Sequence, residues 1–251
     1  TPGHSIDMSR VELPMMFNLH HPLNLEVIGA EAQHDNMQSA AYRVIWGFLR
    51  KCPASKVRFC IFDPKEGGGS VRMLSSFVNK MPDSYKRAVT QMSRTEELLS
   101  CLKELEGQTL DFIRDRPDYD DLLDYNAHNP RRTEAITLLM LYDFPLNADA
   151  RCLELLSSVM QKGNRCGSYV VLCRNTAVEV ASSYDHIDEK LAELEKNCVQ
   201  IECKENGFAL LPYHLSVRLI EKPDAGQLEK FAVEYHKAVE KLSVQSFHFE
   251  E

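Results

Sequence analysis

The sequence predicts an α/β fold, with a mainly parallel sheet flanked by helices on both faces and an amphipathic helix at the C-terminal end. Strand-like and helix-like segments alternate between Asn24 and Cys173. The strand-like segments are apolar throughout, which is typical of strands buried on both faces of a parallel sheet. The last long segment has a single apolar stripe at helical spacing. Such a sheet places any ligand at the carboxyl ends of its strands.

The strands are predicted from short apolar runs that end at glycine, proline or aspartate. The run VRFCIF, for example, stops at Asp63-Pro64, and ITLLMLY stops at Asp143. The four expected strands are Asn24–Gly29, Val57–Phe62, Ile136–Tyr142 and Tyr169–Cys173.

Helices are predicted where apolar residues recur three and four positions apart. The first follows Gly29 and stops before Pro53, and the last has Asp224 and Gln227 as a capping pair. The expected helical segments are Met37–Leu49, Leu98–Leu105, Tyr119–Tyr125, Cys152–Met160, Ile187–Leu194 and Asp224–Leu242, with two further strand-like pieces at Val199–Cys203 and Leu215–Ile220. We therefore divide the chain into a linker at residues 1–12, an α/β domain at residues 13–222 and a C-terminal helix or connector at residues 223–251.

Composition excludes several classes of protein. The chain has 251 residues, a net charge of −8 and 44% hydrophobic residues, as expected for a globular protein. It has no apolar run near the ~20 residues that span a bilayer and no signal-peptide pattern, so we expect a cytoplasmic chain without membrane contact. Its eight cysteines form no C-x-x-C pair, so we expect buried thiols and no metal site. The negative charge disfavours DNA binding by this chain alone.

The turn after the first strand has the frame of a P-loop, in which a strand, a glycine turn and a helix follow one another. An intact P-loop reads G-x-x-x-x-G-K-[ST], and its lysine and hydroxyl bind the phosphates and Mg²⁺. Aligned on Gly29, the chain reads GAEAQHDN. His34 then stands at the second glycine, Asp35 at the lysine and Asn36 at the hydroxyl. The turn also fits an ordinary strand–helix connection of another α/β fold.

The strand ITLLMLY ends at Asp143, as the Mg²⁺-binding strand of a P-loop NTPase ends at an aspartate. The next residue is Phe144, where such proteins usually have an acidic catalytic residue. An aspartate in this place is also a common helix cap. If Asp143 is the equivalent residue, Asn36 leaves the metal ion without its usual hydroxyl ligand. Phe144 leaves the attacking water without its usual acidic residue.

The order of these segments resembles the FtsK/SpoIIIE branch of the FtsK–HerA P-loop ATPases, which implies a RecA-like fold. The resemblance covers about Leu13 to Thr176, and its strongest match is the turn at Arg165, Cys166 and Gly167. The matching segments are NLEVIG, VRFCIFDPK, ITLLMLYDFP and SSVMQKGNRCGSYVVLCRNT, together with the insert DFIRDRPDYDDLLDYNAHN. Proteins of this branch often have tandem ATPase domains, one of them degenerate.

The resemblance implies a catalytically degenerate ATPase-like domain with a structural or regulatory role in a DNA-translocating ring motor. Its partners would be neighbouring ATPase domains, with DNA reached only through the assembled motor, and Arg165 or Arg174 would contact a neighbour's nucleotide. We expect no catalytic residue, no metal, and at most weak binding of Mg-ATP. The vestigial nucleotide-binding positions would be Gly29, His34, Asp35, Asn36 and Asp143.

Two alternatives remain open from the residues. In one, the chain is a protein-interaction module of a type VII secretion-like tandem ATPase, and a secreted-substrate peptide takes the place of nucleotide. In the other, it is an active ATPase with a non-standard loop. The negative charge and the absence of a basic run favour the peptide over direct contact with DNA.

Overall fold

The structure is a computed structural model that describes residues 24–52, 56–65, 89–130, 132–178, 187–205, 207–219 and 224–247. The expected linker at residues 1–12 lies outside the described residues. The strands form one sheet in the order β3-β2-β4-β5-β1-β6-β7-β8. Pairing is parallel from β3 to β6 and antiparallel from β6 to β8. The strands are β1 (Asn24–Gly29), β2 (Val57–Phe62), β3 (Val89–Met92), β4 (Ile136–Phe144), β5 (Ser168–Asn175), β6 (Cys198–Lys204), β7 (Gly207–Leu210) and β8 (Leu215–Val217).

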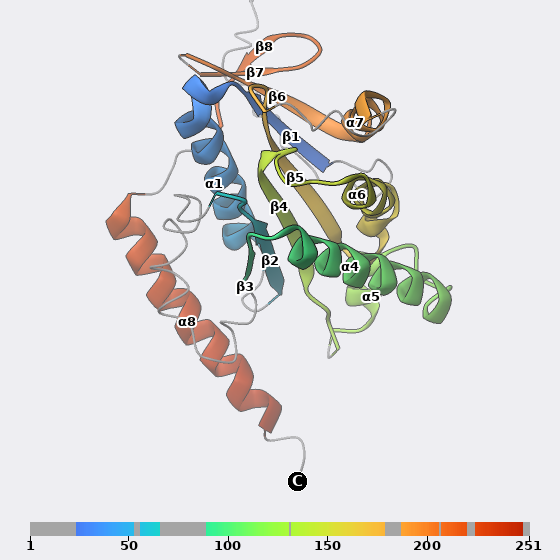
Figure 1. Cartoon of the computed structure of the whole chain (residues 1–251). Helices are drawn as coiled ribbons and strands as arrows, with labels where there is room; N and C mark the ends of the chain where they lie inside the picture. Colours follow the sequence, from blue (N-terminus) through green and yellow to red (C-terminus); the bar gives the residue numbers. More distant parts are fainter. Residues whose placement is uncertain are drawn as a thin grey trace, which may run out of the picture.

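Helices cover both faces of this sheet (Figure 1), which confirms the predicted mainly parallel α/β architecture. Helices α1 and α8 lie on one face, and α4, α6 and α7 lie on the other. The helices are η2 (Glu31–Gln33), α1 (His34–Lys51), α4 (Thr95–Asp115), α5 (Leu122–His128), α6 (Ala150–Lys162), η3 (Gly163–Cys166), α7 (Ile187–Glu195) and α8 (Ala225–Phe247). In the described residues no helix is both long and apolar enough to span a membrane.

Two strands of the sheet were not predicted. Strand β3 has only four residues, VTQM, and two of them are exposed, so it lacks the apolar run that marks a buried strand. Strand β7 pairs with β6 and β8 in a small antiparallel extension that the sequence presents only as β-like pieces. The expected Ile136–Tyr142 strand also continues through Asp143 to Phe144, so that Asp143 lies within β4.

Helix α8 closes the core of this chain. Ala232, Tyr235 and Val239 are buried in the cluster that α1 forms with the sheet, and the Phe231 ring meets Trp46 edge-on at 4.8 Å between centroids. The predicted Asp224–Gln227 capping pair is confirmed. The Gln227 amide donates to Asp224 Oδ1 at 2.7 Å, and the Asp224 amide donates to Gln227 Oε1 at 3.1 Å.

Strand β1 contains a buried charge. Glu26 is 1% exposed, and its carboxylate accepts a hydrogen bond from Gln200 Nε2 at 2.8 Å. The carboxylate also forms an ion pair with Arg174 Nη1 at 3.4 Å. Burial raises the pKa of Glu26, and these two partners offset only part of that effect. Arg174 also pairs with Glu195. The charged form of Glu26 therefore costs stability wherever it is populated.

We expect Glu26→Gln to raise the free energy of unfolding at pH 7 by about 1 kcal/mol, because it removes a buried charge and keeps a hydrogen-bonding group. A carboxyl whose pKa is raised on folding stabilises the protein as pH falls from its folded pKa towards 4.5, its unfolded value. The gain in free energy of unfolding of the variant over the wild type, measured by urea unfolding, should therefore shrink as pH falls over that range. Glu195→Gln is the matched control and should give no gain. A loss with Glu26→Gln would mean that the Arg174 ion pair outweighs the cost of burial.

Candidate nucleotide-binding site

Strands β2, β4, β5 and β1 are neighbours in the sheet, so their carboxyl ends meet at one edge. The turn from β1 into η2 and α1 lies at this edge, as a P-loop does. Gly29 begins the turn, and a Cβ there would lie 2.9 Å from Met37 Sδ. A larger residue at this position would therefore displace the Met37 side chain of α1.

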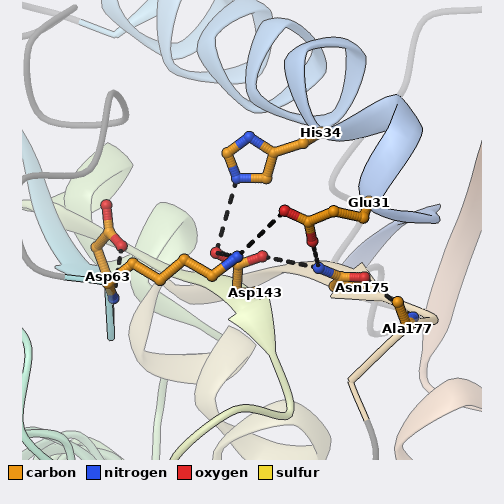
Figure 2. Close-up of polar contacts among 7 residues, drawn as sticks. Glu31, His34, Asp63, Asp143, Asn175 and Ala177 are labelled. Carbon is orange, nitrogen blue, oxygen red and sulfur yellow. Dashed lines mark hydrogen bonds and ion pairs between the residues drawn. The ribbon is translucent and has the colours of Figure 1, made fainter.

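Asp143 is the centre of the site. Its carboxylate is buried, and three side chains from other elements converge on it: Lys65 Nζ at 3.2 Å, His34 Nε2 at 3.7 Å and Asn175 Nδ2 at 3.0 Å. Figure 2 shows His34 reaching down from the start of α1 and Asn175 approaching from the end of β5. The backbone of Asp143 has φ 48°, in the left-handed region that aspartate and asparagine tolerate better than most residues.

Glu31 belongs to the same group of side chains (Figure 2). It accepts a hydrogen bond from Asn175 Nδ2 at 2.6 Å and lies 3.5 Å from Lys65 Nζ. The Asn175 hydrogen bond and then the Lys65 charge lower the pKa of Glu31. Partial burial works to lower the pKa of Lys65, but Asp143 and Glu31 outweigh it and raise that pKa. We call Glu31, His34, Lys65, Asp143 and Asn175 the strand-end network.

The structure brings together only part of the predicted site. His34 and Asp143 join the network beside the Gly29 turn, whereas Asp35 is exposed at the start of α1. Asn36 instead donates to the Lys204 carbonyl at 3.1 Å, at the end of β6. Sequence reasoning did not assign a role to Lys65 or Asn175. Their signals were available, because Asp63-Pro64-Lys65 and Arg174-Asn175 each follow an apolar strand.

The two arginines considered for contact with a neighbouring subunit are engaged within the chain. Arg165 Nε donates to the Asp120 carbonyl at 3.2 Å. Arg174 pairs with Glu26 and Glu195. A contact of Arg174 with a neighbour's phosphate would require it to leave a buried carboxylate, which costs free energy. The intermolecular role of Arg174 remains a prediction.

The residues present do not fit Mg-ATP. Phosphate binding at this turn depends on a lysine and a hydroxyl, whose places are taken by Asp35 and Asn36. The ammonium group of Lys65 lies at the site but is already shared by two carboxylates. Within the described residues, no three His, Cys, Asp or Glu side chains are arranged to hold a metal ion. In the described part of the site, this one ammonium group faces two carboxylates, so it has no charge to spare for a triphosphate.

Comparison with known proteins places this geometry in context. No protein-family model and no curated protein matches the sequence. Solved structures do match, including EssC (ATPases 2 and 3) from Geobacillus thermodenitrificans, with a TM-score of 0.54 and 11% identity over 92% of this chain and 45% of that chain. The pCW3 conjugation coupling protein TcpA, in its monomer form with ATPgS, has a TM-score of 0.51 and 12% identity, over 74% of this chain and 50% of that chain.

A third match is EccC (ATPases 2 and 3) from Thermomonospora curvata in complex with a signal sequence peptide. It has a TM-score of 0.51 and 14% identity, over 89% of this chain and 42% of that chain. The chain thus spans half or less of the length of each of these structures. At these identities the likeness concerns the fold. The chain shares the fold of these ATPase structures, as the resemblance of its segment order to FtsK/SpoIIIE-type P-loop ATPases implies.

Proposed function

We propose that this chain is a catalytically degenerate ATPase-like domain with a structural or regulatory role in an FtsK/SpoIIIE-type DNA-translocating ring motor. The observation that supports it is the strand-end network, in which Lys65 and Asn175 already bind the carboxylates of Glu31 and Asp143. Phosphoryl transfer depends on positive groups that stabilise charge in the transition state. In the described part of the site, Lys65 is paired with the acids of the chain itself, Glu31 and Asp143.

The domain would then act through contacts between its surface and neighbouring ATPase domains. The EssC and EccC structures that share its fold each contain two ATPases. A net charge of −8 disfavours direct contact with DNA, so DNA would be reached only through the assembled motor. The domain would scaffold the ring, complete a neighbour's active site or regulate a catalytic domain.

We expect no change in melting temperature when Mg-ATP is added to the wild-type chain at millimolar concentration. Ligand at 100 times its dissociation constant stabilises a protein by about 2.7 kcal/mol, which is about 5 °C or more at this size. The control is the quadruple variant Glu31→Ala/His34→Gly/Asp35→Lys/Asn36→Thr, which rebuilds G-x-x-x-x-G-K-T on Gly29 without the Glu31 carboxylate and should respond to Mg-ATP. A shift of that size in the wild type, together with steady ATP hydrolysis, would refute the degenerate assignment.

A second candidate has one specific observation in its favour. The EccC structure with the same fold is a complex with a signal sequence peptide. This chain would then be an interaction module of a type VII secretion-like tandem ATPase, and it would bind a secreted-substrate peptide. The ATPase rate of the full-length protein distinguishes the two candidates. Stimulation by duplex DNA favours the motor, and stimulation by such a peptide with no response to DNA favours the secretion module.

A further inference from the structure

The carboxylate of Glu31 lies where a P-loop domain receives an anion, at the first residue of the helical segment that follows β1. Its two oxygens are bound separately. Asn175 holds Oε2 at 2.6 Å from the end of β5, and Lys65 lies 3.5 Å from Oε1, after the end of β2. One carboxylate therefore ties the β1–α1 turn to two other strands.

The donors on Glu31 are held in place independently of it. Asn175 is 1% exposed, its amide also donates to Asp143 Oδ1 at 3.0 Å, and its oxygen accepts from the Ala177 amide at 3.0 Å. Lys65 is held by the buried Asp143 carboxylate at 3.2 Å. The Glu31 side chain itself is 63% exposed, so its carboxylate lies between solvent and the buried Asn175 amide, beside the partly exposed Lys65 ammonium group.

We infer that Glu31 is a resident anion, which fills an anion site built by Lys65 and Asn175 and makes the arrangement of the strand ends independent of nucleotide. The inference rests on the proposed function and explains how the degenerate site stays ordered without a ligand. The class of ligand that fits the same donors is a small oxyanion. Acetate matches the charge and shape of the carboxylate that it would replace, and inorganic phosphate matches the ligand of an intact P-loop.

Removal of Glu31 should uncover this site. With Glu31 absent, Lys65 is balanced by Asp143 alone, and one N–H of the Asn175 amide loses its acceptor. An added anion restores both contacts at the position that the solvent-exposed Glu31 side chain leaves. Phosphate carries more negative charge than acetate and would be repelled more strongly by the Asp143 carboxylate, so acetate should bind at least as well as phosphate.

The test is the melting temperature of Glu31→Ala in sodium acetate or sodium phosphate, compared with sodium chloride at equal ionic strength and constant pH. We expect the variant to melt below the wild type in chloride and to recover by about 3–5 °C when the anion reaches ten times its dissociation constant. The wild type should show no such specific response. Lys65→Ala in the Glu31→Ala background should abolish the recovery.

Asp35→Ala is the matched control, because it removes one negative charge from the same turn and leaves Glu31 on its donors. If it responds to acetate as Glu31→Ala does, net charge and not a vacated site explains the effect, and the inference fails. It also fails if Glu31→Ala gains nothing from either anion. A wild type that binds and steadily hydrolyses Mg-ATP would instead refute the proposed function, so the two failures are separate observations.

Discussion

Asp143→Ala should lower the free energy of unfolding by about 3 kcal/mol. The substitution removes the common acceptor of Lys65, His34 and Asn175. Loss of one partner of a buried ion pair costs about 3–5 kcal/mol, and the partial exposure of Lys65 places the expected cost at the lower end. Alanine also tolerates φ 48° less well than aspartate, which adds to the loss. Urea unfolding followed by circular dichroism would measure it.

The control for that change is Asp143→Asn. Asparagine tolerates the left-handed backbone and keeps one of the two acceptor oxygens, so the change removes the charge and replaces the other oxygen by an NH2 donor. We expect a loss of about 1–2 kcal/mol, smaller than for alanine. If both variants lose less than about 0.5 kcal/mol, the strand-end network contributes no measurable stability, and the view that it replaces a bound ligand would have to be abandoned.

These expectations assign Asp143 a structural role. In P-loop NTPases the aspartate at this strand end holds Mg²⁺. Here its two oxygens are occupied by Lys65, His34 and Asn175. If the proposed function is correct, the residue keeps its place and exchanges a metal ion for protein donors, and its removal would be detected in stability and not in turnover.

The parallel part of the fold could be predicted from the sequence because its strands are continuously apolar. Strands β1, β4 and β5 are buried along almost their whole length, and β2 is buried except at Arg58 and Cys60. Burial on both faces favours a mostly apolar run in place of strict alternation. Strand β3 pairs at the edge, where exposed polar residues are tolerated, and its sequence VTQM has no such run. Strand β3 could not be predicted from the sequence because an edge strand forms by pairing with its neighbour and does not need an apolar run of its own.

The site was less predictable than the fold. The P-loop frame identified His34 and Asp143 because their spacing from strands is local information. The partnership of Lys65 and Asn175 depends on which strands are neighbours, and the order β2-β4-β5-β1 cannot be read from composition or periodicity. The same holds for Arg174, whose position at a strand end indicated an outward role, while the sheet places it against Glu26.

Gly167→Ala should lower the free energy of unfolding by about 3 kcal/mol. Gly167 follows η3 with φ 76°, and its carbonyl accepts from the Thr137 amide at 2.9 Å, at the start of β4. A left-handed backbone costs most other residues about 1–2 kcal/mol. A Cβ there would also lie 2.4 Å from Leu122 Cδ2, and Leu122 is buried, so its side chain or α5 would have to shift at a further cost of about 1–3 kcal/mol.

The control is Gly107→Ala in α4, where a Cβ meets nothing within 4 Å and the helical backbone suits alanine. It should stabilise the chain by about 0.5–1 kcal/mol. The double variant Gly167→Ala/Leu122→Ala separates the two costs of the first change, because it removes the clash and keeps the backbone strain. If Gly167→Ala proves neutral, the turn has room that the structure does not show.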